Sequence, residues 1–249
     1  MTVENILEFL NKYCPFSLAE EWDNVGLNVG RKTAEVTKVL VALDLTLETV
    51  RAAKEMGAQL IVTHHPLLFD PLRQVTDDAV NGERILALAE NGIAHIACHT
   101  NLDAADGGVN DCLAAALGLS EVEPLGNLAK MGILDTTLYA LADKLKKELP
   151  SEHCLGVCCN EQVHKVAIIG GSGGSMLQEA IDAGCDTFVT GELKYNHFLD
   201  GREQGINLLT FGHFETEYIV LAPLAEALQK AFPELDVQRM LRKAPMECF

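Results

Sequence analysis

Apolar and polar positions repeat one pattern in two separate blocks of the chain. In each block an apolar run precedes an amphipathic stretch closed by glycine, and a second apolar run follows. The blocks cover residues 36–65 (VTKVLVALDLTLETVRAAKEMGAQLIVTHH) and residues 163–192 (VHKVAIIGGSGGSMLQEAIDAGCDTFVTGE). This order is typical of a β-α-β unit. We therefore predict one such unit in each block.

The two blocks align without a gap at an offset of 127 residues, from Val36 to Val163. Identical pairs include Lys38 and Lys165, Val39 and Val166, Ala53 and Ala180, Gly57 and Gly184, and Val62-Thr63 and Val189-Thr190. Such self-similarity indicates an internal duplication. Thr46 is expected to cap the first helix, and Ser175 with Gln178 is expected to form a capping box on the second.

The surrounding sequence extends the repeat to the whole chain. Helical patterns at 3–12 and 137–148 are each followed by a short strand pattern, and the strands within the blocks are apolar throughout. Such strands favour parallel sheets covered by helices on both faces. We predict an internally duplicated α/β fold of two intertwined, three-layer α/β/α halves with mainly parallel sheets. The expected halves are residues 1–125 and 126–249.

Histidines and carboxylates follow the predicted strands. His64 and His65 end the first block, just before Pro66, and each copy later ends in a His-x-x-x-carboxylate segment. A spacing of four places both side chains on one side of a helical turn. The six candidate metal ligands are His64, His65, His99, Asp103, His213 and Glu217.

Six imidazole and carboxylate ligands suit two metal ions with about three protein ligands each. The alternative is that these are ordinary polar residues at loop tips, but two equivalent His-x-x-x-carboxylate segments and a His-His pair favour metal. The donors fit two divalent ions per chain, and zinc, iron, manganese and nickel all remain open.

Other polar residues near these strand ends receive secondary roles. Glu192 takes the place of His65 in the second block, and both Glu192 and His197 are candidates for proton transfer, substrate contact or support of a ligand. Asp44 is placed to orient a ligand histidine. The remaining histidines, His95, His153 and His164, are interpreted as structural or solvated.

Two further features have a structural and a functional interpretation. The glycine-rich turn at 170–175 could bind phosphate through backbone N–H groups, although a packing turn is favoured because the first block has no equivalent glycines. Trp22, the single tryptophan, lies beside the turn residues Asp23 and Asn24. Burial of the indole explains it, and a role in the site is the alternative.

Composition narrows the class of protein. Hydrophobic residues make up 48% of 249 positions, which predicts a globular fold, and the net charge of −17 makes nucleic acid an unlikely partner. No apolar run is long enough for a membrane span and no signal peptide is recognised, so we expect a cytoplasmic protein. The eight cysteines are expected to be reduced. For Cys154, Cys158 and Cys159 a core role is favoured over a soft-metal site.

Five motifs together resemble the GTP cyclohydrolase type 2 homologue family, also called NIF-three-like. They are Glu21-Trp22-Asp23-Asn24-Val25-Gly26-Leu27, Thr63-His64-His65-Pro66, His99-Thr100-Asn101-Leu102-Asp103, Gly191-Glu192, and Gly212-His213 with Glu217. The resemblance implies a dinuclear metal centre with the same six ligands. It also implies a ring-shaped homohexamer built as a trimer of dimers, in a short form without an inserted domain.

Two functions follow as hypotheses. The first is a metal-dependent hydrolase that acts on a nucleotide such as GTP, or a related small molecule, through a metal-activated water. The second is a non-enzymatic metal-binding chaperone or regulatory protein, which needs the same ligands but no general acid or base.

Overall fold

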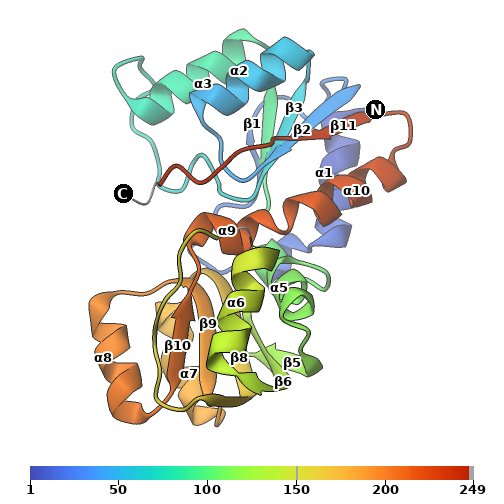
Figure 1. Ribbon diagram of the computed structural model, residues 1–249. Coiled ribbons are helices and arrows are strands. Elements are labelled where there is room, and N and C mark those ends of the chain that lie inside the picture. The colour runs from blue at the N-terminus through green and yellow to red at the C-terminus, as the bar shows by residue number, and fades with distance from the viewer. Residues whose placement is uncertain (150, 247–249) are drawn as a thin grey trace. The chain divides into compact units, whose positions relative to one another are not determined.

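The computed structural model describes residues 1–149 and 151–246 and has a mixed α/β fold with two sheets (Figure 1). The chain divides into two compact units. The first unit is Met1–Ala105 with Leu221–Arg242, and the second is Asp106–Val220 with the described residues from Lys243 onward. In the described part of the chain, no helix is both long and apolar enough to cross a membrane.

The first unit contains a five-stranded sheet in the order β1-β4-β3-β2-β11. Its strands are β1 (Gly26–Val29), β2 (Lys38–Ala42), β3 (Leu60–Thr63), β4 (Ala94–Ala97) and β11 (Asp236–Arg239). Strands β2, β3, β4 and β11 are parallel, and β1 pairs antiparallel with β4. The sheet is therefore mainly parallel, as predicted.

Helices cover both faces of this sheet (Figure 1). They are α1 (Val3–Tyr13), α2 (Leu47–Met56), α3 (Val80–Glu90), the short α4 (Thr100–Ala104) and α10 (Leu221–Ala231), with a 3₁₀ turn η1 at Phe16–Leu18. Leu40 and Ile61 pack beneath α2 and α3, while α1 and α10 lie on the other side. Burial on both faces explains why the central strands β2, β3 and β4 are largely apolar. Thr46 caps α2, and Gly57 ends it in the left-handed conformation (φ 69°), as predicted.

The second unit contains a six-stranded sheet in the order β5-β6-β8-β9-β10-β7. Its strands are β5 (Ser120–Leu125), β6 (Ala129–Thr137), β7 (Leu155–Val157), β8 (Gln162–Ser172), β9 (Thr187–Glu192) and β10 (Asn207–Thr210). Strands β8, β9 and β10 are parallel, whereas β5, β6 and β7 pair antiparallel. The parallel arrangement is thus limited to the central strands of this sheet.

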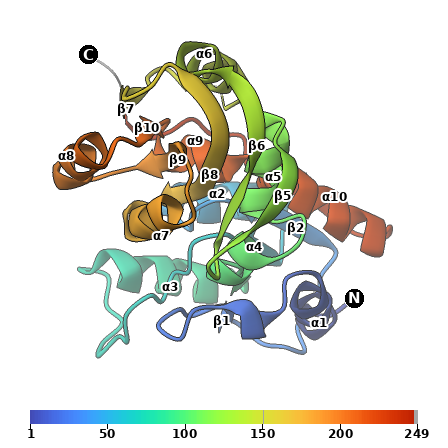
Figure 2. The same cartoon turned by 90° about the horizontal axis from the view of Figure 1, so that it is seen from below.

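Helices also pack on both faces of the second sheet (Figure 2). They are α5 (Val109–Leu117), α6 (Leu138–Glu148), α7 (Leu177–Asp182), α8 (Tyr195–Gln204) and α9 (His213–Tyr218), with a 3₁₀ turn η2 at Gly174–Met176. Helix α7 packs on Ala167, Phe188 and Leu208. Helices α5, α6 and α9 contact the sheet through β6, β8 and β9.

Both predicted β-α-β units are present. In each unit, three parallel strands (β2-β3-β4 and β8-β9-β10) are followed across the sheet by a short antiparallel strand, β1 or β7. This shared strand order is what an internal duplication would produce. The duplication itself stays a prediction. The two sheets differ on the other side of the parallel strands. There β11 is parallel to β2, whereas β6 is antiparallel to β8.

The division into units differs from the predicted halves 1–125 and 126–249. Strands β5 and β6 form an antiparallel hairpin around Gly126 (φ 59°), and β6 pairs with β8. The expected join therefore lies inside one sheet, and the first division falls after Ala105. Leu221–Arg242 returns to the first unit, because β11 pairs with β2.

Two local expectations were wrong. Ser175 and Gln178 do not form a capping box, because Ser175 lies inside η2 and the Gln178 side chain donates to Asp182. Cys158 and Cys159 are exposed and so are not core residues, because the edge strand β7 ends at Val157.

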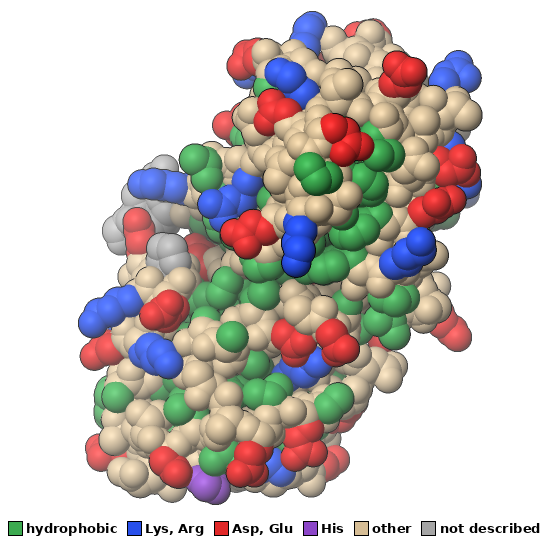
Figure 3. Space-filling model, turned by 90° about the vertical axis from the view of Figure 1, so that its right-hand side faces the viewer, with side chains coloured by type: hydrophobic (Ala, Val, Ile, Leu, Met, Phe, Trp, Pro, Cys, Tyr) green, Lys and Arg blue, Asp and Glu red, His purple; other side chains and the backbone are tan. Residues whose placement is uncertain are grey.

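Among the described residues the cysteines are free thiols, and Cys248 lies outside them. On the face shown in Figure 3, lysine and arginine side chains are interspersed with acidic ones, and the described residues there form no continuous basic patch.

His95 is a buried structural histidine on β4. Its Nε2 lies 2.7 Å from the hydroxyl of Thr63, which donates to the carbonyl of His65, so Nε2–H is the donor to Thr63. Burial lowers the pKa of His95 to about 3. The ring is therefore neutral in the folded protein at any pH above that value.

We predict that His95 weakens the fold at acidic pH. An unfolded histidine titrates near 6.5, so between about pH 6.5 and 3 the unfolded chain binds the extra proton. The free energy of unfolding should then fall with decreasing pH, by up to about 1.4 kcal/mol per pH unit from this residue. Urea unfolding of chelator-treated protein from pH 6.5 to 4.5 should show a shallower fall for His95→Gln.

His164→Gln is the matched control for this measurement. The hydrogen bond to Asp135 raises the pKa of the exposed His164, so its removal should not flatten the pH dependence. Equal slopes for wild type and His95→Gln would contradict the prediction.

Candidate metal centre

The carboxyl ends of three parallel strands in the first unit carry polar side chains. Asp44 follows β2, His64 and His65 follow β3, and His99 follows β4. Carboxyl ends of parallel strands meet at one edge of a sheet, which is where α/β proteins build their sites. Asp103 lies four residues beyond His99, on α4.

The three histidines of this edge form a compact cluster. Ring centroids of His64 and His65 are 5.0 Å apart, and those of His99 lie 5.2 and 5.5 Å from them. Their potential ligand atoms all lie within 4.8 Å of one another. Asp103 Oδ1 is 3.6 Å from His64 Nε2. These four predicted ligands are therefore neighbours within one unit.

Each ring of the cluster is held at Nδ1 by an oxygen that can only accept. His64 faces the carbonyl of Cys98 at 2.9 Å. His65 faces Asp44 Oδ1 at 2.8 Å, and His99 faces Asp23 Oδ1 at 3.0 Å. Carbonyl and carboxylate oxygens accept, so Nδ1 carries the proton and the neutral ring has its lone pair on Nε2. Metal-binding histidines in proteins use this arrangement, and the donor set fits a divalent cation.

Asp23 is a site residue that the sequence pattern did not identify beyond a turn. Its Oδ2 also accepts from the backbone N–H of Thr100, at 3.0 Å, and from the Thr100 hydroxyl. Burial alone would raise its pKa, but the hydrogen bonds from His99 and Thr100 prevail and lower the pKa of Asp23 to about 2. Asp23 is therefore a carboxylate at neutral pH. The signal was its place in the Glu-Trp-Asp-Asn-Val-Gly segment.

Trp22 corrects another expectation, because its indole is 55% exposed and not buried. The loop directs Asp23 inward to His99 and the neighbouring Trp22 outward. The indole centroid lies 6.0 Å from the ring of His99 and 5.5 Å from that of Phe69. The alternative interpretation, a role beside the site, is the one that its position favours.

The second unit holds the other two predicted ligands on α9, with His213 as its first residue and Glu217 four residues later. His213 Nε2 lies 3.1 Å from Glu217 Oε1, and His213 Nδ1 lies 3.1 Å from Glu192 Oε1. Glu217 is buried. His213 therefore repeats the arrangement of the first unit, with a carboxylate on Nδ1 and a second carboxylate beside Nε2.

The glycine-rich turn is explained by packing. Gly171 has φ 61°, and a Cβ there would clash with the carboxylate of Glu217. Three of its N–H groups also have protein acceptors, since Gly170, Gly171 and Gly173 donate to the side chains of Asn110, Thr216 and Thr190. These amides are committed to protein acceptors, which supports the packing interpretation over a phosphate site.

The two proposed catalytic residues have contacts of their own. Glu192 is the exposed carboxylate that holds His213 Nδ1. His197 lies on α8, where its Nδ1 accepts from the backbone N–H of Lys194 at 3.2 Å. The proton of His197 is therefore on Nε2 in the neutral ring.

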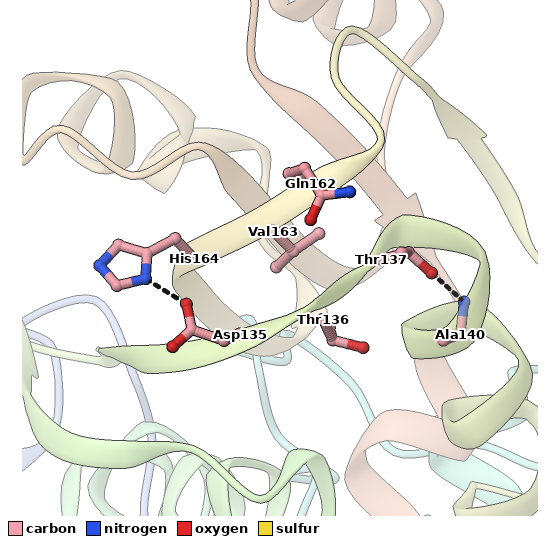
Figure 4. A pocket seen from close by; sticks show the side chains of 7 residues that line it. All are labelled: Asp135, Thr136, Thr137, Ala140, Gln162, Val163 and His164. Carbon is pink, nitrogen blue, oxygen red and sulfur yellow. Dashed lines mark hydrogen bonds and ion pairs between the residues drawn. The ribbon is translucent and has the colours of Figure 1, made fainter.

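A pocket of about 480 Å³ in the second unit is a weaker candidate (Figure 4). His164 is its one imidazole, and the Nδ1 of this ring donates to Asp135 at 2.6 Å. Thr137 caps α6 through the backbone N–H of Ala140. The pocket holds a single exposed His–carboxylate pair and no convergent ligand group, which agrees with the solvated interpretation of His164.

The chain is similar to known proteins over nearly its whole length. The family model Duf34/NIF3 (NGG1p interacting factor 3) matches residues 1–245. A Clostridium perfringens protein named GTP cyclohydrolase 1 type 2 homolog is 34% identical, over 100% of this chain and 99% of its own length.

Two solved structures share the fold. A Bacillus cereus protein related to NIF3 superposes with a TM-score of 0.94 at 25% identity, and a hypothetical protein of Staphylococcus aureus superposes with a TM-score of 0.93 at 30% identity. Each comparison covers 100% of this chain and 99% of the other. The match is therefore continuous over both units, and the chain belongs to the Duf34/NIF3 family.

Proposed function

We propose that this chain is a cytoplasmic, dinuclear metal-dependent hydrolase that acts on a nucleotide such as GTP or on a related small molecule. The observation that carries the proposal is the common state of the ligand histidines. His64, His65, His99 and His213 each have an acceptor on Nδ1, which leaves the metal-binding lone pair on Nε2. The proposed reaction and substrate are taken from the names of the relatives, which refer to GTP cyclohydrolase.

Two ions require both ligand groups. The first unit supplies three imidazoles and Asp103, and the second supplies His213 and Glu217. Two catalytic ions with about three protein ligands each need all six, so neither group suffices alone. We propose all six residues as metal ligands. Nitrogen and oxygen donors suit zinc, iron, manganese or nickel.

In this proposal the protein side chains orient the metal ligands and transfer protons. Bound divalent ions would supply a water of lowered pKa and a Lewis acid for the electrophile. Asp23, Asp44 and Glu192 fix the orientation of their histidines. For proton transfer we propose Glu192, whose side chain is 54% exposed, and His197, whose Nε2 carries a proton. The homohexameric ring remains part of the proposal and rests on the family resemblance.

One observation favours a second candidate, a non-enzymatic metal-binding chaperone or regulatory protein. Glu192 and His197 both have local hydrogen bonds, to His213 and to the start of α8. These contacts explain both residues without catalysis. The two candidates share the ligands and differ in whether these two side chains are needed for turnover.

We predict about two metal ions per chain. Elemental analysis of untagged protein, stripped and reconstituted with zinc, iron or manganese, should give this ratio for wild type. The ratio should fall in His99→Ala and Glu217→Ala, which each remove one ligand, and should be unchanged in His164→Ala. No metal in reconstituted wild type would overturn both candidates.

We predict that Asp23→Asn weakens metal binding by about 10- to 100-fold, because the carboxylate that holds His99 Nδ1 is lost. Competition with a chromophoric chelator measures the affinity. Asp135→Asn makes the same change at the exposed His164 pair and should leave the affinity unchanged. Equal affinities of both variants would show that Asp23 does not support the ligand.

We predict that Glu192→Gln and His197→Gln lower kcat about 100-fold or more with saturating metal and GTP as the probe. Metal content measured at saturation should be unchanged. A loss of rate in His197→Gln would then report proton transfer, whereas Glu192→Gln also removes the carboxylate that holds His213 Nδ1. Metal-loaded wild type without turnover of GTP or other nucleotides would favour the second candidate.

A further inference from the structure

A pocket of about 670 Å³ in the first unit lies beside the histidine cluster. It is formed by the loop that carries Trp22, the loop after β3, strand β1 and helix α3. Its volume is in the range of small-molecule sites, which is about 300–1,000 Å³. The pocket is not needed to hold any of the proposed metal ligands, so its presence requires another explanation.

Two exposed aromatic rings form one wall of this pocket. Trp22 is 55% exposed and Phe69 is 50% exposed, and their ring centroids are 5.5 Å apart at a tilt of 48°. Leu72 and Val75 of the same pocket are 41% and 44% exposed. A contiguous group of exposed large apolar side chains is typical of a binding surface.

The same rings reach the proposed metal site. The centroids of Trp22 and Phe69 lie 6.0 and 6.2 Å from the ring of His99. A flat molecule stacked on either ring would therefore have one edge close to His99. The pocket thus adjoins the place where the proposed chemistry occurs.

Hydrogen bonds hold the two aromatic loops together. The Asn24 amide donates to the carbonyl of Leu68, next to Phe69, and the Asn28 amide donates to the carbonyl of Asn24. The loop that carries Trp22 is thereby tied to the loop that carries Phe69. This tie forms the pocket before any ligand binds, which lowers the cost of ordering it.

The charge of the pocket limits the kind of ligand that it can bind. Asp70 is the one charged residue among those lining the pocket, and a carboxylate accepts hydrogen bonds only. A phosphate group would be repelled here, whereas a ring edge with N–H donors would be favoured. Planar bases stack on aromatic side chains regardless of sequence, because every base has a π face.

We propose that this pocket, the Trp22–Phe69 pocket, binds the planar heteroaromatic ring of the substrate, stacked on the indole of Trp22 and in contact with the tilted ring of Phe69, with N–H donors facing Asp70. That the bound ring is a substrate rests on the proposed hydrolase function. Binding of the ring itself does not, since none of the pocket's stacking groups is a proposed metal ligand.

The single tryptophan provides the readout. Guanosine titrated into metal-stripped protein should quench Trp22 fluorescence in a saturable manner, and ribose 5-phosphate, which has no aromatic ring, should not. Phe69→Leu keeps apolar volume but removes the ring, and should weaken guanosine binding about tenfold. Asp70→Asn should weaken it severalfold. Tyr139→Ala removes an aromatic side chain that is 64% exposed outside the pocket, and should have no effect.

Trp22→Phe and Trp22→Ala are measured by equilibrium dialysis, because they remove the fluorophore. Trp22→Phe should bind guanosine more tightly than Trp22→Ala. Thermal unfolding of each variant shows whether it is folded.

The outcomes separate this inference from the proposed function. Saturable quenching without turnover in metal-loaded protein supports the pocket and contradicts the hydrolase. Turnover of GTP with an unchanged KM in Phe69→Leu and Trp22→Ala supports the hydrolase and overturns the pocket. The inference is also overturned if guanosine does not quench Trp22 fluorescence. The same holds if the pocket binds an anilinonaphthalene sulfonate dye that guanosine does not displace, which would indicate an apolar partner instead.

Discussion

The candidate metal centre depends on the protonation state of its imidazole rings. A neutral histidine binds a metal through Nε2 only when the proton is on Nδ1, and an acceptor beside Nδ1 fixes that state. Asp23, Asp44 and Glu192 supply a carboxylate oxygen to three of the rings, and Cys98 supplies a backbone carbonyl to the fourth. Without these acceptors the proton could be on either ring nitrogen, and the lone pair of Nε2 would not be fixed.

The architecture of the sheets brings ligand and acceptor together. In the first unit the chain leaves β2, β3 and β4 at one edge, so an acceptor that follows β2 reaches a histidine that follows β3. In the second unit Glu192 is the last residue of β9, and His213 begins α9, shortly after β10. Room for Glu217 comes from Gly171, where any side chain would occupy the position of the carboxylate. Strand order and one glycine thus set the positions of groups that are far apart in sequence.

A single loop joins the metal site to the Trp22–Phe69 pocket. Asp23 points inward and holds His99, while the adjacent Trp22 points outward and stacks near Phe69. Trp22 lies in a turn that the backbone N–H of Asp23 closes on the carbonyl of Glu20, so one short segment carries both the indole of the pocket and the acceptor for His99.

Local patterns in the sequence were enough to determine the β-α-β units, the cap at Thr46, and the grouping of His64, His65, His99 and Asp103, because periodicity and strand ends act over a few residues. They also indicated Asp44, which follows an apolar strand. Tertiary structure alone decided the β5–β6 hairpin, the return of β11 to the first sheet, the exposure of Trp22 and the role of Asp23. These features depend on strand pairing or on hydrogen bonds between residues of different segments, such as Asp23 with His99. A pattern of a few neighbouring residues does not show which other segment they will contact.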